Sequence, residues 1–227
     1  MRTIQTRLLF VLALAFVAFA GNAVAQTQAS PILNTLEVQK LAASAEPADN
    51  ARLAAHFSAL AARYTAEAKQ HSSMAASFGS NRTIGPGMSV HCKRIAELNT
   101  QSATTLRELA THHNKVAAGV ASTPPAGAAA FQGGTDAREP TEKELTALAA
   151  KARSVADHRA LQEYFTTKAR RYTAEANQHD AFAKAYHGTR MTWAPGMHDH
   201  LARLARESAK EATASATMHQ DLAGVAR

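Results

Sequence analysis

One nine-residue segment occurs twice in this chain of 227 residues. Residues 63–71 read RYTAEAKQH, and residues 171–179, 108 positions later, read RYTAEANQH. In the longer windows around this segment, 14 of the 31 positions in 48–78 are identical to those in 156–186. Self-similarity at a fixed spacing is typical of a fold built from copies of one supersecondary unit. We therefore expect two equivalent structural units.

Both copies have the pattern of packed helices. Alanine and other good helix formers are frequent, and no stretch alternates β-branched with polar residues, which favours helix over strand. Core-type side chains, with one histidine among them, recur every three or four residues, the heptad spacing of helices that pack along a seam. These positions are Leu53, Phe57, Ala61, Tyr64, Ala68, His71, Ala75 and Phe78 in the first copy, and Leu161, Phe165, Ala169, Tyr172, Ala176, His179, Ala183 and Tyr186 in the second. The pattern predicts an all-α protein.

Capping residues mark where helices begin. Ser154 with Asp157, and Thr141 with Glu144, have the spacing of a capping box, and Pro47 suits a first helical turn. From these signals and the heptad pattern we predict two short helices and four long ones. The short helices are expected at about 33–45 and 142–153, and the long ones at about 47–78, 88–117, 155–187 and 196–223.

Three segments are predicted to separate these helices. Residues 79–87 and 187–196 each contain a proline beside glycine or alanine, which should break the helix and reverse the chain. Residues 119–140 are rich in proline, glycine and alanine and are typical of a linker. The chain then divides into a first helical unit, 26–118, and a second, 141–227. We predict two tandem antiparallel helical hairpins packed as a four-helix bundle with short extra helices.

Residues 1–25 have the layout of a secretory signal peptide. Arg2 and Arg7 precede an apolar run, residues 8–20, and small residues stand before the expected cleavage site at Gln26. The run is too short to span a bilayer comfortably. We expect an exported protein, periplasmic or secreted, with no transmembrane segment after cleavage.

Charge and motifs argue against several functional classes. Without Arg2 and Arg7 the chain has 23 basic and 18 acidic side chains, and the basic ones are spread among glutamates, which is unlike a nucleic-acid-binding surface. The chain lacks a nucleophile elbow, a glycine-rich phosphate loop and a zinc-protease helix motif, so we expect no enzyme. The single cysteine, Cys92, cannot form an intramolecular disulfide.

Eleven histidines are the unusual part of the composition, and several recur in both copies. Glu67 and His71 are one helical turn apart, as are Glu175 and His179, so each carboxylate and imidazole share a helix face. Imidazole, thiolate and carboxylate groups are ligands of copper or zinc. We expect His71, His91 and Cys92, with Met74 and Met88, near the turn of the first hairpin, and His179 facing His200 in the second. The candidate metal ligands are His71, His91, Cys92, Glu67, His113, His179, His200, Glu175 and His219.

Two functions follow from the sequence as alternatives. The first is an exported, non-enzymatic bundle with a structural or protein-interaction role in the cell envelope, meeting an envelope protein or a second copy of itself. The second is a copper- or zinc-binding protein that uses the repeated histidines. The second requires free, convergent imidazole nitrogens, whereas in the first His71 and His179 are core residues hydrogen-bonded to neighbours such as Glu67 and Glu175. A pH-sensing role for these histidines is a third interpretation.

Overall fold

The computed structural model describes residues 32–44, 46–82, 84, 86–119 and 139–225. The predicted signal peptide and almost all of the predicted linker lie outside these residues. Within them every regular element is a helix, which confirms the all-α prediction. In chain order the helices are α1 (Thr35–Ala42), α2 (Pro47–Ser80), α3 (Pro86–Ala118), α4 (Glu142–Lys151), α5 (Val155–Tyr186) and α6 (Ala194–Val225).

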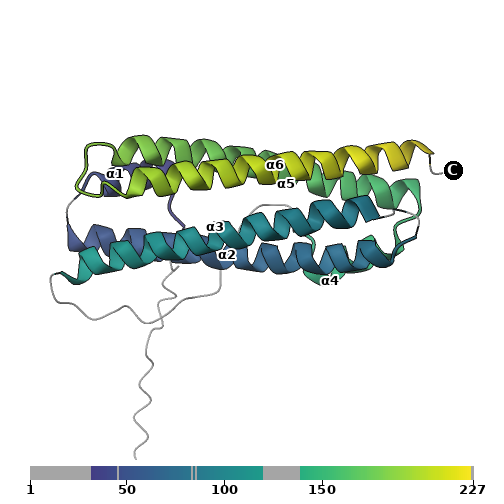
Figure 1. The fold of residues 1–227 in the computed structure, drawn as a ribbon, viewed down its shortest axis with the longest axis horizontal. Coiled ribbons are helices and arrows are strands. Elements are labelled where there is room, and N and C mark those ends of the chain that lie inside the picture. Colours follow the sequence, from purple (N-terminus) through teal and green to yellow (C-terminus); the bar gives the residue numbers. More distant parts are fainter. Residues whose placement is uncertain (1–31, 45, 83, 85, 120–138, 226–227) are drawn as a thin grey trace, which may run out of the picture.

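The four long helices form two hairpins that lie side by side. Helix α2 packs along α3, and α5 packs along α6, as predicted. Figure 1 shows that the two hairpins turn at opposite ends of the bundle, with α1 near one end and α4 near the other. With 34 residues, α2 is about 50 Å long at the usual rise per residue. The molecule is therefore an elongated four-helix bundle with two short helices added.

The two hairpins meet differently along their two seams. Helix α3 packs closely on α6, whereas no Cα atoms of the described helices α2 and α5 come within 8 Å of each other. The short helices pack here: α1 contacts both α5 and α2, and α4 packs mainly on α2, which belongs to the other unit. The wider α2–α5 seam leaves room for long polar side chains between the helices.

Helix starts agree with the predicted caps. Ser154 and Asp157 form a capping box at the start of α5, and Thr141 and Glu144 form one at the start of α4. The predicted connectors are too long, because Pro86 begins α3 and Pro195 lies in the first turn of α6. Proline fits a first turn well, since its missing N–H would have no intrahelical partner there.

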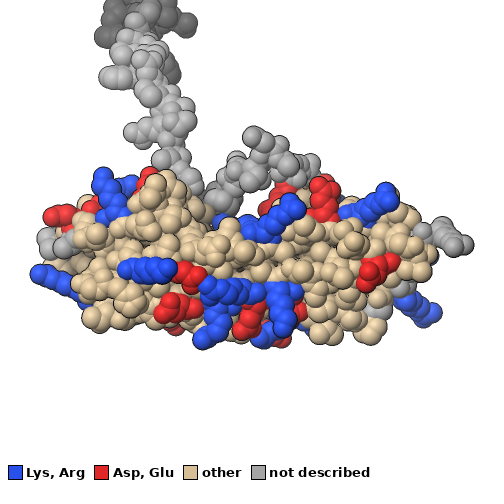
Figure 2. Space-filling view, turned by 90° about the horizontal axis from the view of Figure 1, so that it is seen from above, with Lys and Arg blue, Asp and Glu red and all other residues tan. Residues whose placement is uncertain are grey.

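The predicted seams form the core. All eight seam positions of the first copy are buried, and in the second copy only Ala169 is partly exposed. Among the described residues, no helix has the length and apolar character needed to cross a membrane. Figure 2 shows basic and acidic side chains interspersed on the surface rather than gathered into a field of one sign.

Candidate functional site

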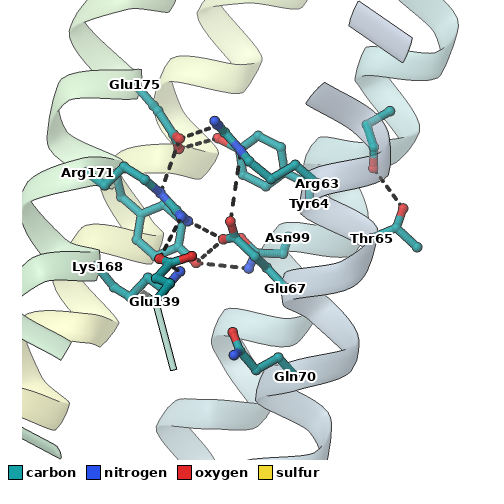
Figure 3. Close-up of polar contacts among 12 residues, drawn as sticks. Arg63, Tyr64, Thr65, Glu67, Gln70, Asn99, Glu139, Lys168, Arg171 and Glu175 are labelled. Atoms are coloured by element: carbon teal, nitrogen blue, oxygen red, sulfur yellow. Dashed lines mark hydrogen bonds and ion pairs between the residues drawn. The ribbon is translucent and has the colours of Figure 1, made fainter. Parts of the chain in front are cut away.

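The repeated RYTAE segments meet across the α2–α5 seam. On one side, Glu175 of α5 accepts hydrogen bonds from Arg63 Nη2 and from Tyr64 Oη, the latter at 2.5 Å. The Arg171 Nε atom lies 3.3 Å from the same carboxylate. Glu175 is only 7% exposed, so this acceptor is almost wholly satisfied by protein groups. Figure 3 shows these side chains converging between the helices.

The same contacts recur with the two helices exchanged. Glu67 of α2 accepts hydrogen bonds from Arg171 Nη2 and from Tyr172 Oη, the latter at 3.1 Å. Asn99 of α3 adds a 2.9 Å hydrogen bond from its Nδ2 to the Tyr172 oxygen. The arginine and the tyrosine of each copy therefore both bind the glutamate of the other copy. We call the six residues Arg63, Tyr64, Glu67, Arg171, Tyr172 and Glu175 the central network.

Burial and ion pairing act in opposite directions on the central network. Burial by itself raises the pKa of Glu67, but the Arg171 guanidinium, with Lys168 and Arg63, outweighs it and holds the pKa below its usual value. Burial also raises the pKa of Tyr64 well above its ordinary value, and Glu175 raises it further. Glu67 is thus ionised, and both phenols are protonated near neutral pH, since the pKa of Tyr172 is raised as well. In this state both phenolic hydroxyls and the Nη2 groups of both arginines donate to carboxylates, whereas the buried Nε atoms of Arg63 and Arg171 have no hydrogen-bond partner among the described residues.

A buried lysine extends this network toward α4. The side chain of Lys168 is 2% exposed, and its Nζ atom lies 2.6 Å from Glu139 Oε1. The same carboxylate oxygen is 3.6 Å from Arg171 Nη1. Glu139 precedes α4, so the start of the second unit is attached to the centre of the bundle.

The structure does not pair Glu67 with His71 as the sequence suggested. Both ring nitrogens of His71 are buried without any hydrogen-bond partner in the described part of the chain, and Glu67 is occupied by Arg171 and Tyr172. A carboxylate and imidazole one turn apart share a face, but a guanidinium from the neighbouring helix is the stronger partner.

His179, the counterpart of His71, contacts another histidine. Its Nδ1 atom lies 3.2 Å from Nδ1 of His198, and the rings stack at 5.3 Å. The predicted partner, His200, is two residues further along α6 and so points to a different side of the helix. His200 is half-buried and lies 2.6 Å from Arg203 through its Nδ1 atom.

Each of the four long helices contributes one buried histidine to the end of the bundle near the α5–α6 turn. The Leu33 amide donates to His56 Nδ1 at 3.0 Å, and Phe57 stacks on His113 at 5.4 Å and lies 5.5 Å from His198. Phe182 and Tyr186 pack between these rings. We call His56, His113, His179 and His198 the histidine quartet; only His113 and His179 of these are among the metal ligands that the sequence suggested.

The opposite end carries a smaller group. His158 and His219 approach through their Nδ1 atoms at 3.2 Å and stack at 5.5 Å. His113 and His219 occupy equivalent places in the two units, because each ring stacks on the matching phenylalanine, Phe57 or Phe165. Each also contacts the matching position at the start of α2 or α5, Asn50 or His158.

The remaining sequence candidates lie apart from these groups. His91 is half-buried on the α3–α6 seam, where its Nδ1 atom lies 2.6 Å from Glu211 Oε2. Cys92 is fully buried, and burial raises the pKa of its thiol far above the ordinary value. Adjacent residues on a helix face different directions, so these two neighbours in sequence contact different surroundings.

Burial keeps the core histidines neutral. Desolvation lowers the pKa of His56, His71 and His179 to about 3, and that of His113 and His219 to about 4. Nearby cationic groups add to this effect, such as Arg63 beside His56 and His179. Neutral imidazole is also the form that binds a metal ion.

The described residues hold no group of three or more His, Cys, Asp or Glu side chains arranged to bind a metal ion. Of the nine sequence candidates, six belong to the central network, the two histidine groups or the α3–α6 seam, whereas His71 and Cys92 are buried outside these groups and His200 is half-buried beside Arg203. Sequence reasoning missed the arginines and tyrosines of the central network, although they lie in the most exactly repeated segment. It also missed His158, which aligns with Asn50 rather than with a histidine.

Comparison with known proteins identifies no relative of this chain. No protein-family model, no curated protein and no solved structure matches this chain. The class that the fold defines is thus an elongated helical bundle of two duplicated hairpins, and its function must be argued from its own residues.

Proposed function

We propose that this is an exported, non-enzymatic scaffold with a structural or protein-interaction role in the cell envelope. The observation that supports it most is the central network, because the charged groups that both copies keep are used to hold the two hairpins together. A buried network in which every charge is paired favours one rigid arrangement. The surface it leaves for a partner is long, helical and of mixed charge.

The scaffold function is tested by cross-linking in the cell that makes the protein. A photoreactive residue is placed at Leu36 or at Val90, which are large apolar side chains that are 77% and 61% exposed. We expect a discrete cross-linked product containing an envelope protein or a second copy, and recovery of the chain from the periplasmic or secreted fraction. Only uncross-linked monomer at both sites, or retention in the cytoplasm, would contradict the proposal.

Transition-metal binding is a second candidate, and a specific observation favours it. Buried ring nitrogens without hydrogen-bond partners occur on His56, His71, His198 and His219. Such atoms are rare in folded proteins and call for a compensating contact such as a bound ion. Copper and zinc titrations of the purified chain, with thermal unfolding in parallel, test this class, because a ligand that binds only the folded state raises the melting temperature.

A further inference from the structure

His71 is the least satisfied polar group in the core. Its side chain is fully buried, and neither Nδ1 nor Nε2 has a partner in the described residues. The nearest aromatic rings, Tyr164 and Phe165 of α5, lie at 6.1 and 6.2 Å and offer packing only. A buried polar group without a hydrogen bond loses the interactions that it would make with water, so His71 carries a desolvation cost that its counterpart His179 avoids.

The difference between the two copies has a definite origin. His179 meets His198, and the position equivalent to His198 in the first hairpin is Ser89. Ser89 donates its hydroxyl to the Ala75 carbonyl at 2.9 Å and is therefore not available to His71. The first hairpin has kept the buried imidazole without keeping its partner.

Three sulfur-containing side chains lie near the level of His71 along the helix axes. The contact between Ser89 and Ala75 fixes the register of the antiparallel pair α2 and α3, which places position 71 level with position 93, about 1.5 Å along the axis from Cys92. Met74 follows His71 by one turn and Met88 precedes Cys92 by one turn, and all four side chains are fully buried.

Tyr164 of α5 links the two helices of this group. Its ring adjoins His71 at 6.1 Å. Burial raises the pKa of the Tyr164 phenol well above its ordinary value, and Cys92 is among the neighbours that raise it further. The imidazole lies beside this ring, and the register of α2 against α3 places the thiol at nearly the same level of the core.

We propose that His71, Cys92, Met74 and Met88 form a binding site for one Cu(I) ion in the first hairpin. Thiolate and thioether groups are soft ligands that suit Cu(I), imidazole suits copper as well, and a site without carboxylate or carbonyl oxygens does not suit magnesium or calcium. This inference deepens the metal-binding candidate and does not depend on the scaffold function. Only two of its four donors are His or Cys, and the other two are methionines, so this site is compatible with the absence of a group of three His, Cys, Asp or Glu ligands among the described residues.

The binding step balances without an electron transfer. Copper enters as Cu(I), the Cys92 S–H bond breaks, a Cu–S bond forms, and the proton leaves to solvent. His71 binds through a neutral nitrogen that is already free of hydrogen bonds, so no protein contact is broken there. The second hairpin cannot form this site, because Leu201 and Phe182 replace Cys92 and Met74.

The test is an anaerobic competition of the purified chain, residues 26–227, against a chromophoric Cu(I) chelator. We expect one Cu(I) per wild-type chain, and weakening by at least about 100-fold in Cys92→Ser and His71→Leu, the upper range for loss of even an indirect metal contact. Met74→Leu combined with Met88→Leu should weaken binding as well, whereas the matched control Met197→Leu in the second hairpin should not. X-ray absorption of the loaded chain should show sulfur and nitrogen neighbours of copper.

Circular dichroism and the melting temperature without copper establish that each variant is folded. If His71→Leu is unfolded, the double variant Met74→Leu/Met88→Leu still tests whether these side chains bind copper. Cu(I) should raise the melting temperature of the wild type and not of Cys92→Ser. The proposal is overturned if the folded wild type retains no Cu(I), or if binding survives Cys92→Ser but is lost in His91→Ala. Either result leaves the scaffold function to its own cross-linking test.

Discussion

The two hairpins share a backbone plan and differ in what lies at their buried histidines. In the second, His179 contacts His198 and lies between apolar residues, among them Phe182. In the first, His71 has no hydrogen-bond partner among the described residues and lies close to the level of Cys92. The repeated arginine, tyrosine and glutamate side chains are identical in the two copies, so the copies have diverged around their histidines and not at their shared interface.

The residues of the central network and the buried histidines differ in how their substitution affects the other copy. Arg63, Tyr64 and Glu67 each bind a residue of the other copy, so a change in one copy leaves a buried charge unpaired in the other. The buried histidines also contact rings of the other hairpin, but mainly by packing, so their substitution leaves no charge unpaired. The charged residues of the interface are thus constrained in pairs, while the histidine positions can differ between the copies.

The largest expected effect is loss of stability in acid. In the unfolded chain histidines take up protons below about pH 6.5, whereas in the folded protein His56, His71 and His179 do so only near pH 3. The unfolded state therefore binds more protons in this range, and the free energy of unfolding falls as pH falls, by about 2 kcal/mol per histidine between pH 7 and pH 5. Urea unfolding across this range should show the loss.

Two double variants, one at each end of the bundle, test which buried histidines cause the loss of stability in acid. His179→Leu with His198→Leu removes two members of the histidine quartet, and His158→Leu with His219→Leu removes the pair at the opposite end. Each double variant should flatten the dependence of stability on pH relative to wild type. A wild-type protein equally stable at pH 5 and pH 7 would show that the core histidines are not held neutral by burial.

Breaking the central network should have the next largest effect. Glu67→Ala removes a buried carboxylate and leaves the partly buried Arg171 without its main acceptor, and Glu175→Ala does the same to Arg63. Removal of one partner from a buried ion pair costs about 3–5 kcal/mol, and we expect that loss from each variant in urea unfolding. Glu163→Ala, at an exposed position of the same helix α5, is the control and should change stability by less than about 0.5 kcal/mol.

The double variant Glu67→Ala/Glu175→Ala sharpens the comparison. Because the two carboxylates share Arg63 and Arg171, their effects should be non-additive by about 0.5–3 kcal/mol. Strict additivity would mean that the two halves of the network act as separate ion pairs.

The two equivalent histidines should respond to leucine with opposite signs. His71→Leu removes an unsatisfied imidazole from an apolar layer and should leave the free energy of unfolding unchanged or raise it by about 1 kcal/mol. His179→Leu removes the partner of His198 and should lower it by about 1–2 kcal/mol. Both are measured at pH 7.5 without copper, and equal destabilisation by the two variants would contradict this account of the difference.

The smallest expected effect concerns the starts of α2 and α5. Ser154→Ala removes the capping-box hydroxyl of α5 and should cost about 1 kcal/mol. Glu46, at the equivalent place before α2, makes no side-chain cap, because Pro47 already removes one N–H that would need a partner. Glu46→Ala should therefore be neutral, and a cost equal to that of Ser154→Ala would show an unrecognised contact.

Local signals in the sequence were sufficient for the fold. The heptad positions, the two capping boxes and the duplicated windows correctly predict two hairpins in one bundle, since each signal depends on contacts within one helix or between neighbours. The connector prolines show the limit of such signals. Pro86 and Pro195 were expected to end a helix, yet each stands in the first turn of the next one.

Contacts across the bundle could not be predicted in this way. Glu67 and His71 share a face, but the choice of Arg171 over His71 depends on how α2 and α5 are set against each other. His198 and His200 differ by two residues, and only the register of α5 against α6 decides which one meets His179. Exact repetition of Arg63 and Tyr64 was the one sequence signal that marked the central network.

The crossed contacts of the short helices and the central network give the chain the character of a dimer contained in one molecule. Each copy offers a complementary arginine, tyrosine and glutamate, and α4 of the second unit covers α2 of the first. Joining such halves on one chain makes their association an intramolecular step, whose effective concentration does not depend on the concentration of the protein. The two halves of one chain also need not be identical, as the halves of a homodimer must be. One hairpin can therefore have Cys92 where the other has Leu201.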